Sequence, residues 1–300
     1  MNIKIGSRGS KLALWQAEWV KFRLLKAGHE AEIQIIKTTG DKLPNAPLTS
    51  GGTKGLFIKE IEEALLAGHI DLAVHSMKDL PIQQPDGLTV GAVPERADAR
   101  DVLISREAKS LAQLPARARV GTGSLRRSSQ LAALRGDLSI VPIRGNVDTR
   151  LAKLDRGECD AVALASAGLT RLGLASRVTQ YFSVDEICPA VGQGALAIQI
   201  REGDAATAGA IAELDHPLSH QAVRAERALL RRLGGGCAVP IAGHATPLDG
   251  RLRLVGVVAS IDGSRVLRAA ATAPVEDAER LGGAVAEDLL KQGAAEILEM

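Results

Sequence analysis

Polar side chains follow several predicted strands directly, in positions where they could bind a ligand or act on it. Each group precedes a predicted helix, and open α/β sheets bind ligands beyond the carboxyl ends of their strands. Two such units enclosing a cleft are a common way to hold a small molecule. The groups are Ser7-Arg8, Ser76-Met77-Lys78-Asp79, Thr122-Gly123-Ser124 and Arg144-Gly145-Asn146. The spacing therefore predicts a ligand site built from strand ends.

Arginine is the commonest charged residue near these strand ends. Arg126 and Arg127 follow the turn VGTGS at a predicted helix N-terminus, Arg144 ends a strand, and Arg150 and Arg171 lie on nearby helices. Backbone N–H groups at a helix N-terminus and planar guanidinium groups both suit anions, and guanidinium matches carboxylates best. The group predicts a ligand with several carboxylates. The alternative is that each arginine is an ordinary solvated surface residue.

Two further residues could carry covalent or proton chemistry. Asp79 follows Lys78 at a strand end, where a carboxylate could move protons and stabilise developing positive charge, or simply cap the next turn. Cys237 stands in GGGCAVPI, where three glycines leave the sulfur open and could make it a covalent anchor. Cys159 and Cys188 fit the commoner role of a small buried apolar side chain.

Nucleotide and metal chemistry are not supported by the motifs. GSRGSK and GGTKG do not fit the P-loop pattern, and GTGSLR lacks the third glycine of a dinucleotide fingerprint. The histidine pair in HPLSH has the right spacing for zinc but lacks the glutamate of H-E-x-x-H. We therefore expect no metal site.

Composition describes an ordinary soluble globular chain of two or three domains. Of 300 residues, 46% are hydrophobic and 24% charged, and the formal net charge is +2. Between Glu95 and Arg177 there are 15 basic residues against 9 acidic ones, and the rest of the chain is net acidic. Near neutrality and 2% aromatic residues argue against nucleic acid and membrane partners. Three widely spaced cysteines and the absence of an export signal indicate a reducing cytoplasm.

Short β-rich runs alternate with amphipathic helical stretches, which predicts α/β layers with a largely parallel sheet. The first unit is expected to contain strand 3–5, helix 10–27, strand 31–37, helix 56–66 and strand 70–75. The second is expected to contain strand 119–121, helix 124–134, strand 138–143, helix 147–156 and strand 161–165. The segment 39–55 is rich in Gly, Pro and Thr, which favours a long mobile loop that could act as a lid. The RADARD stretch after Glu95 is interpreted as a crossover.

The remaining chain predicts a return to the first unit and a smaller α+β domain. The apolar run 195–200 resembles another buried strand of the first unit. The last domain is expected to contain helix 218–233, strands 239–246, 251–260 and 264–272, and helix 275–292. These boundaries give three domains: 1–95 with 190–212, 96–189, and 213–300.

The dispersed motifs together resemble the porphobilinogen deaminase family, also called hydroxymethylbilane synthases, from end to end. The motifs that carry the resemblance are GSRGSKLALWQ (6–16), GGTKGLFIKE (51–60), AVHSMKDLP (73–81), GTGSLRR (121–127), IRGNVDTRL (143–151), AGLTRLG (167–173), VGQGAL (191–196) and GGGCAVP (234–240). The resemblance implies two periplasmic-binding-protein-like lobes around a cleft, and a third, small α+β domain with a three-stranded antiparallel sheet. It also implies a transferase of tetrapyrrole (haem, porphyrin) biosynthesis.

The activity implied by the resemblance explains the arginines. Such enzymes join four porphobilinogen molecules head to tail, with release of ammonia, on a dipyrromethane primer bound by thioether to a loop cysteine, here Cys237. They then release the linear tetrapyrrole by hydrolysis. Each pyrrole carries two carboxylates. The matching catalytic residue is Asp79.

The matching binding residues fall into two sets. Those implied to contact the dipyrromethane cofactor are Ser76, Lys78, Asp79, Thr122, Ser124, Arg126, Arg127 and Asn146. Those implied to contact substrate or the growing chain are Arg8, Gln16, Phe57, Arg144, Arg150 and Arg171. One departure is Ala238, after the anchor, where the family often has glutamine, and this puts a side-chain contact of that loop in doubt.

Two other functions remain open at this point. A non-catalytic two-lobed binding protein for small carboxylates would need the arginines but neither Cys237 nor Asp79. A cysteine-nucleophile acyl transferase would need a histidine base near Cys237, and the nearest, His244, is separated from it by a strand-like run. For the transferase we expect a monomeric cytoplasmic protein whose partners are porphobilinogen and, transiently, the next enzyme of the pathway, to which it hands its product.

Overall fold

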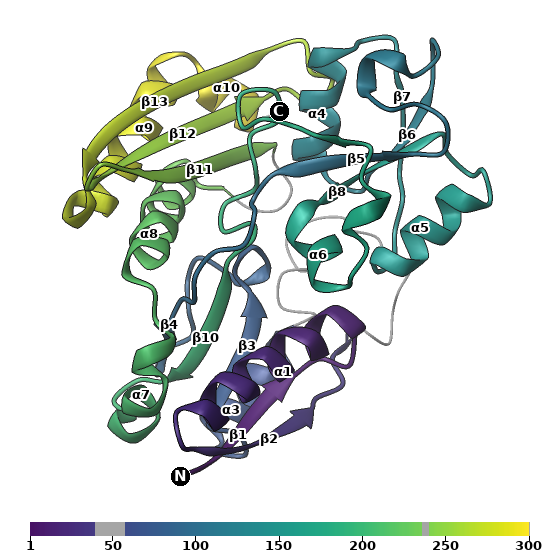
Figure 1. Cartoon of the computed structure of the whole chain (residues 1–300). Coiled ribbons are helices and arrows are strands. Elements are labelled where there is room, and N and C mark those ends of the chain that lie inside the picture. Colours follow the sequence, from purple (N-terminus) through teal and green to yellow (C-terminus); the bar gives the residue numbers. More distant parts are fainter. Residues whose placement is uncertain (40–57, 236–239, 300) are drawn as a thin grey trace. The chain divides into compact units, whose positions relative to one another are not determined.

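The computed structural model describes residues 1–39, 58–235 and 240–299 (Figure 1). The described residues form three β-sheets flanked by helices. Contacts group the chain into two compact units, Met1–Ala97 with Gly194–His220, and Asp98–Gln193 with Gln221–Met300, called unit 1 and unit 2 below. Unit 1 holds one sheet and unit 2 holds two. The expected mixed α/β class with a small three-stranded antiparallel sheet is confirmed.

The sheet of unit 1 has the strand order β2-β1-β3-β10-β4. Its strands are β1 (Asn2–Ser7), β2 (Glu30–Ile35), β3 (Leu72–Ser76), β4 (Leu88–Ala92) and β10 (Leu196–Arg201). β1 runs parallel to β2 and β3, whereas β10 is antiparallel to β3 and β4. The expected return of the chain to the first unit is therefore confirmed, because β10 lies between two strands that precede it by more than a hundred residues.

The helices of unit 1 cover this sheet with apolar faces. They are α1 (Lys11–Lys26), α3 (Lys59–Leu66) and α7 (Ala205–Ile211). α1 begins where Ser10 Oγ accepts the N–H of Ala13, so that one of its otherwise unpaired N–H groups is satisfied. Val20 and Leu24 of α1 are fully buried against Ile3 and Ile5 of β1. This packing fixes the end of β1, where Arg8 begins the next loop.

The first sheet of unit 2 repeats the plan, with strand order β7-β6-β8-β5-β9. Its strands are β5 (Asp101–Ser105), β6 (Arg119–Gly121), β7 (Ser139–Val141), β8 (Ala161–Ala165) and β9 (Gln180–Tyr181). Its helices are α4 (Leu125–Leu134), α5 (Val147–Asp155) and α6 (Ser166–Arg171). β6 is parallel to β7 and β8, and β5 is antiparallel to β8 and β9. The loops after β6 and β7 therefore leave the same edge of the sheet.

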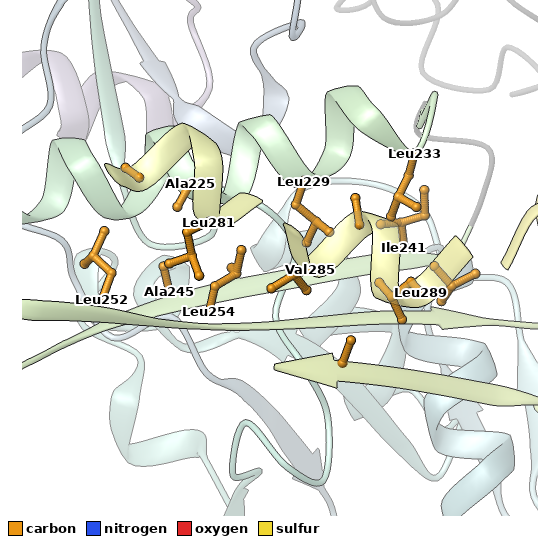
Figure 2. Packing of buried hydrophobic residues seen from close by; sticks show 14 of the residues in the cluster. Ala225, Leu229, Leu233, Ile241, Ala245, Leu252, Leu254, Leu281, Val285 and Leu289 are labelled. Atoms are coloured by element: carbon orange, nitrogen blue, oxygen red, sulfur yellow. The ribbon is translucent and has the colours of Figure 1, made fainter. Parts of the chain in front are cut away.

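The second sheet of unit 2 is the antiparallel meander β11-β12-β13. Its strands are β11 (Ile241–Leu248), β12 (Arg251–Ala259) and β13 (Val266–Pro274), and its helices are α8 (Pro217–Arg232), α9 (Ala278–Lys291) and α10 (Ala294–Leu298). Figure 2 shows Leu229 of α8 and Val285 of α9 packed against the sheet with Leu254. All three side chains are fully buried, so the small domain has its own hydrophobic core.

This meander packs directly on the rest of unit 2. Val255 and Val257 of β12 form an apolar cluster with Cys188 and Ala242. Gly263, in the turn between β12 and β13, has φ +73°, and an added Cβ would collide with the carbonyl oxygen of Ser129 on α4. The small domain therefore contacts the helix that carries Arg126 and Arg127.

The main differences from the predicted elements lie in short or charged segments. β4, β5, β9, α6, α7 and α10 were not predicted. RADARD is not only a crossover, because its last residue, Asp101, begins β5. The SMKDLP turn contains the 3-10 helix Met77–Asp79. None of the described helices is long and apolar enough to span a bilayer.

Candidate functional site

The strand ends of unit 1 bring four of the predicted site residues to one sheet edge. β1 and β3 are parallel neighbours, with Ile5 paired to Leu72, so Arg8, which follows β1, and Ser76, which ends β3, lie at the same edge of the sheet. The 3-10 helix after β3 then presents Lys78 and Asp79 as exposed side chains. The predicted grouping of these polar residues at strand ends of unit 1 is therefore confirmed. Their roles remain predictions.

Gln16 joins this edge from α1. It is 2% exposed, and its Nε2 donates to Ser76 Oγ at 2.8 Å. Ser7 Oγ in turn donates to the carbonyl oxygens of Arg8 and Ala13, at 3.1 and 3.2 Å. These bonds tie the start of α1 to the ends of β1 and β3, so the backbone around Arg8 is held from two sides.

Below this edge lies a polar pair that the sequence did not indicate. His75 on β3 is buried, and its Nε2 lies 3.1 Å from Gln199 Oε1 on β10. Gln199 Nε2 donates to Gln84 Oε1 at 2.7 Å and to Glu62 Oε1 at 3.0 Å. Burial is the main cause that lowers the pKa of His75 to about 4; the hydrogen bond to Gln199 opposes this shift, and the charge of Arg8 adds to it. His75 is therefore neutral near pH 7 and supports the strand that leads to Asp79.

In unit 2 the loops after the parallel strands β6 and β7 carry the next predicted residues. Thr122 Oγ1 accepts the N–H of Ser124 at 3.2 Å, and Ser124 Oγ caps α4 by accepting the N–H of Arg127 at 3.4 Å. After β7, Arg150 Nε donates to the Gly145 carbonyl at 2.8 Å. Gly145 has φ +108°, and an added Cβ would lie 2.7 Å from Thr149, so this turn requires glycine.

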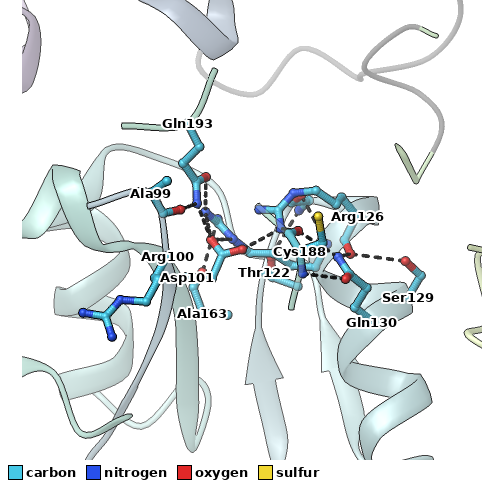
Figure 3. Close-up of polar contacts among 12 residues, drawn as sticks. Ala99, Arg100, Asp101, Thr122, Arg126, Ser129, Gln130, Ala163, Cys188 and Gln193 are labelled. Carbon is cyan, nitrogen blue, oxygen red and sulfur yellow. Dashed lines mark hydrogen bonds and ion pairs between the residues drawn. The ribbon is translucent and has the colours of Figure 1, made fainter. Parts of the chain in front are cut away.

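The centre of unit 2 is an ion cluster on Asp101 (Figure 3). Asp101 is 0% exposed, and its Oδ2 accepts from Arg126 Nη1 at 2.5 Å. Its Oδ1 accepts from Arg127 Nε at 2.8 Å and from Gln193 Nε2 at 2.9 Å. The two guanidinium groups hold the pKa of Asp101 well below its usual range in spite of its burial. The carboxylate is therefore ionised at physiological pH.

For Arg126 and Arg127 the sequence predicts either a ligand carboxylate or solvent as partner, and the structure adds a buried protein carboxylate. Arg126 and Arg127 are each only 6% exposed, and part of each guanidinium is bound to Asp101. Asp101 and Gln193 were missed because they lie 25 and 67 residues from Arg126 in sequence. The only sequence signal was the acidic end of RADARD and the glutamine of VGQG, and neither indicates a partner by itself.

Other predicted residues are found in varied settings. Arg171, at the end of α6, is partly buried, and desolvation lowers its pKa to about 10. Arg144 is partly buried and Asn146 is exposed. Cys159 and Cys188 are buried as expected, and burial raises the pKa of Cys188 to about 12. Cys237, Ala238, Phe57 and positions 40–55 of the predicted lid lie outside the described residues.

The two histidines of HPLSH have ordinary protein partners. His216 Nδ1 lies 2.8 Å from Ser219 Oγ, and His220 Nδ1 lies 2.8 Å from Asp215 Oδ1. Within residues 1–39, 58–235 and 240–299, no three His, Cys, Asp or Glu side chains gather as metal ligands would. The expectation of a protein without a metal site stays a prediction.

The strand ends of each unit carry groups suited to anions. In unit 1 the hydroxyl of Ser76, the ammonium of Lys78 and the guanidinium of Arg8 lie at one sheet edge with the exposed carboxylate of Asp79. In unit 2 the loops after β6 and β7 carry hydroxyl, amide and guanidinium groups. Donors of this kind hold anions, and an exposed carboxylate can transfer protons.

Solved structures that resemble the chain include substrate-binding proteins of transporters. The methionine-binding protein MetQ covers 73% of this chain and 90% of its own, with TM-score 0.46 and 16% identity. A periplasmic substrate-binding protein from Coxiella burnetii covers 75% and 96%, with TM-score 0.44 and 16% identity. At these TM-scores the likeness carries no argument about ligand or reaction.

Family models and curated relatives match nearly the whole chain. The model described as porphobilinogen deaminase, dipyromethane cofactor binding domain, matches residues 3–209, and the porphobilinogen deaminase C-terminal domain matches residues 220–291. A porphobilinogen deaminase from Pelobacter propionicus is 52% identical over 99% of this chain and 96% of its own. One from Moorella thermoacetica is 51% identical over 100% and 96%. The chain belongs to the porphobilinogen deaminase family.

Proposed function

We propose that this chain joins four porphobilinogen molecules head to tail, with loss of ammonia at each addition, on a dipyrromethane primer attached to Cys237. Hydrolysis then releases the linear tetrapyrrole hydroxymethylbilane and leaves the primer in place. The observation that carries the proposal is the family match over residues 3–209 and 220–291. The strand-end arginines and Asp79 support it independently.

The described residues fit a dipyrromethane group with its four carboxylates. The residues proposed to hold it share hydrogen-bond donors and lie at strand ends or helix starts: Ser76, Lys78, Thr122, Ser124, Arg126, Arg127 and Asn146. Nε and Nη2 of Arg126 make no hydrogen bond within the described part of the chain, so this edge suits a carboxylate. When bound, the group supplies a nucleophilic pyrrole carbon and a covalent anchor.

A second set of residues would hold the incoming substrate and the growing chain. Arg8, Arg144, Arg150 and Arg171 offer guanidinium groups to acetate and propionate side chains. Gln16 is bound to Ser76, so its proposed role is to orient that hydroxyl next to the substrate. Phe57 is proposed to cover the pyrrole rings.

Asp79 is proposed to move the protons of each addition. Its carboxyl would deliver a proton to the departing amine, which leaves as ammonia, and the carboxylate that remains would stabilise positive charge on the substrate. Once the new carbon–carbon bond has formed, the Asp79 carboxylate would accept the proton lost from the attacking pyrrole α-carbon. The carboxyl group ends each cycle in its starting state, so four additions need no further acid or base.

The proposal includes a monomeric protein of the cytoplasm whose partner is a small molecule. The segment from Glu95 to Arg177 has a net charge of +6 and contains five of the arginines proposed to bind ligand carboxylates. Its positive charge is therefore explained by a small anionic ligand and does not require nucleic acid or anionic lipid as a partner. Transient hand-over of the product to the next enzyme of the pathway is part of the same proposal.

Intact-mass measurement of the purified protein tests the proposed function. We expect a covalent adduct with the mass of two linked pyrroles that maps to Cys237, and hydroxymethylbilane formed from porphobilinogen. Cys237→Ser should lack both, whereas the matched control Cys159→Ala should keep both because that thiol is buried in an apolar cluster. An active protein of unmodified mass would contradict the attachment. An unmodified protein that only binds carboxylates would be the non-catalytic binding protein.

A further inference from the structure

The ion cluster of unit 2 contains a carboxylate to which neither the sequence analysis nor the proposed function gives a role. Asp101 is fully buried at the start of β5, and it lies between the two arginines that follow the cap of α4. Leaving a carboxylate this deep in the protein is costly unless its partners are well oriented. Its contacts therefore show what it does to those partners.

Asp101 binds the two guanidinium groups differently. Two nitrogens of Arg127, Nε and Nη2, each lie 2.8 Å from Asp101 Oδ1. Its Nη2 also lies 3.3 Å from Gln193 Oε1, and its Nη1 donates to the Ala163 carbonyl at 3.4 Å. Every nitrogen of this guanidinium thus has a protein partner, which leaves Arg127 little to offer a ligand.

Arg126 is held by one nitrogen only. Its Nη1 donates to Asp101 Oδ2 at 2.5 Å and to the Cys188 carbonyl at 2.7 Å. Its Nε and Nη2 have no partner among the described residues, and these two nitrogens form the side-on edge that binds a carboxylate by two bonds. Asp101 therefore fixes Arg126 at one end and leaves its two-bond edge available.

The net charge of the cluster also favours binding of a carboxylate at Arg126. Two guanidinium groups around one carboxylate leave a net charge of +1 in a buried setting. Buried charges in proteins are normally paired, so one further carboxylate would balance the cluster. Gln193 does not alter this net charge, because its amide is neutral. Its Nε2 donates hydrogen bonds to Asp101 Oδ1 at 2.9 Å and to the Ala99 carbonyl at 2.7 Å.

We propose that Asp101 is a positioning residue of the cofactor site: it binds Arg127 and orients Arg126 so that the free Nε and Nη2 edge of Arg126 accepts one ligand carboxylate. This inference rests on the proposed function, because the carboxylate would belong to the dipyrromethane group. It adds that Arg126 makes the contact and that Arg127 acts through Asp101.

The test compares wild type with Asp101→Asn, Arg127→Met and the double variant. Two quantities are measured: the fraction of purified chains that carry the adduct, by intact mass, and the difference in melting temperature between adduct-bearing and adduct-free protein. Asp101→Asn is nearly isosteric but leaves the two guanidinium groups uncompensated. We expect the adduct-bearing fraction to fall about tenfold or more. The double variant returns the net charge to +1, so it should be no worse than Asp101→Asn alone.

Leu154→Ala is the matched control for lost stability. Leu154 is a fully buried side chain of the same unit, in an apolar cluster that contains neither arginine. It should lower the melting temperature of both forms and leave their difference and the adduct fraction unchanged. The inference is overturned if Asp101→Asn keeps the wild-type adduct fraction and melting difference, if Leu154→Ala loses as much adduct, or if the two losses simply add in the double variant. Absence of the adduct from wild type would instead refute the proposed function.

Discussion

The strand-end sites of the two units rest on different kinds of buried support. In unit 1 the buried pair beneath Ser76 is uncharged: neutral His75 is bound to Gln199. In unit 2 the layer beneath Ser124 is ionic, with Asp101 between Arg126 and Arg127. Both sheets place their loops by the same parallel pairing of neighbouring strands.

This difference matches the chemistry proposed for each unit. Because the buried His75–Gln199 pair is neutral, the charges near Asp79 come from exposed residues and from the substrate. This setting suits a carboxyl group that gains and loses a proton. An ionic support with a surplus guanidinium keeps a permanent positive charge, which suits anion binding. One α/β plan can therefore prepare proton transfer or carboxylate binding by the charge of a few buried side chains.

The largest expected effect separates these two roles. Asp79→Asn should keep the adduct, since no arginine is touched, while turnover falls by about 10²–10⁴-fold because proton transfer is lost. Arg126→Leu should give the opposite pattern, a folded protein without the adduct, because it removes the carboxylate contact. Intact mass and the rate of porphobilinogen consumption measure both. Near-normal turnover in Asp79→Asn, or a full adduct in Arg126→Leu, would contradict the assignment of proton transfer to Asp79 or of carboxylate binding to Arg126.

A smaller effect should appear in the pH dependence of stability. His75 has a pKa of about 4 in the folded protein against 6.5 as the ordinary value, so the unfolded chain takes up a proton that the folded chain refuses. Its contribution is complete above about pH 6.5 and is lost as the pH falls toward 4. The difference corresponds to about 3 kcal/mol in the free energy of unfolding. Denaturant unfolding across this range measures it.

The control for this prediction is a histidine that lies outside the buried layer. His75→Gln should remove most of the loss between pH 6.5 and 4, whereas substitution of the exposed His69 by Gln should leave it unchanged. Asp101 cannot mimic the effect, because its pKa lies below the usual range and its stabilisation is lost only at more acidic pH. An equal slope in wild type and His75→Gln would show that unit 1 is not supported by a neutral histidine.

The sequence predicted those parts of the fold that have a strong local pattern. Strands 119–121 and 161–165 have the predicted bounds, because their apolar runs end in glycine or small residues that stop the strand. α4 also begins where Ser124 predicted it. Segments whose structure depends on distant partners were missed, and β5 is the clearest case, because its first residue is charged and becomes buried only through Arg126 and Arg127.

The same division holds for the candidate site. Residues at strand ends could be predicted, because a strand followed by a helix places them without knowledge of the rest of the chain. Asp101, Gln193 and the His75 pair could not, because each is defined by a partner more than 20 residues away. The roles of Cys237 as the cofactor anchor and of Phe57 as a substrate contact stay predictions from the family resemblance.

The smallest expected change in stability concerns the two serines that cap helices α1 and α4, which form a matched pair. Ser10 caps α1 in unit 1 at 3.3 Å, and Ser124 caps α4 in unit 2 at 3.4 Å. Replacing either by Ala should lower the free energy of unfolding by about 1 kcal/mol. Aspartate is also a good cap, so Ser10→Asp and Ser124→Asp should keep that stability.

Only one of the aspartate variants should change cofactor loading. A carboxylate at position 124 would repel the ligand carboxylate proposed to lie near Arg126, so Ser124→Asp should reduce the adduct-bearing fraction although its helix is capped. Ser10→Asp should carry the adduct as wild type does, because position 10 has no proposed cofactor contact. Equal loading in the two variants would mean that the positive charge of unit 2 does not act at the start of α4.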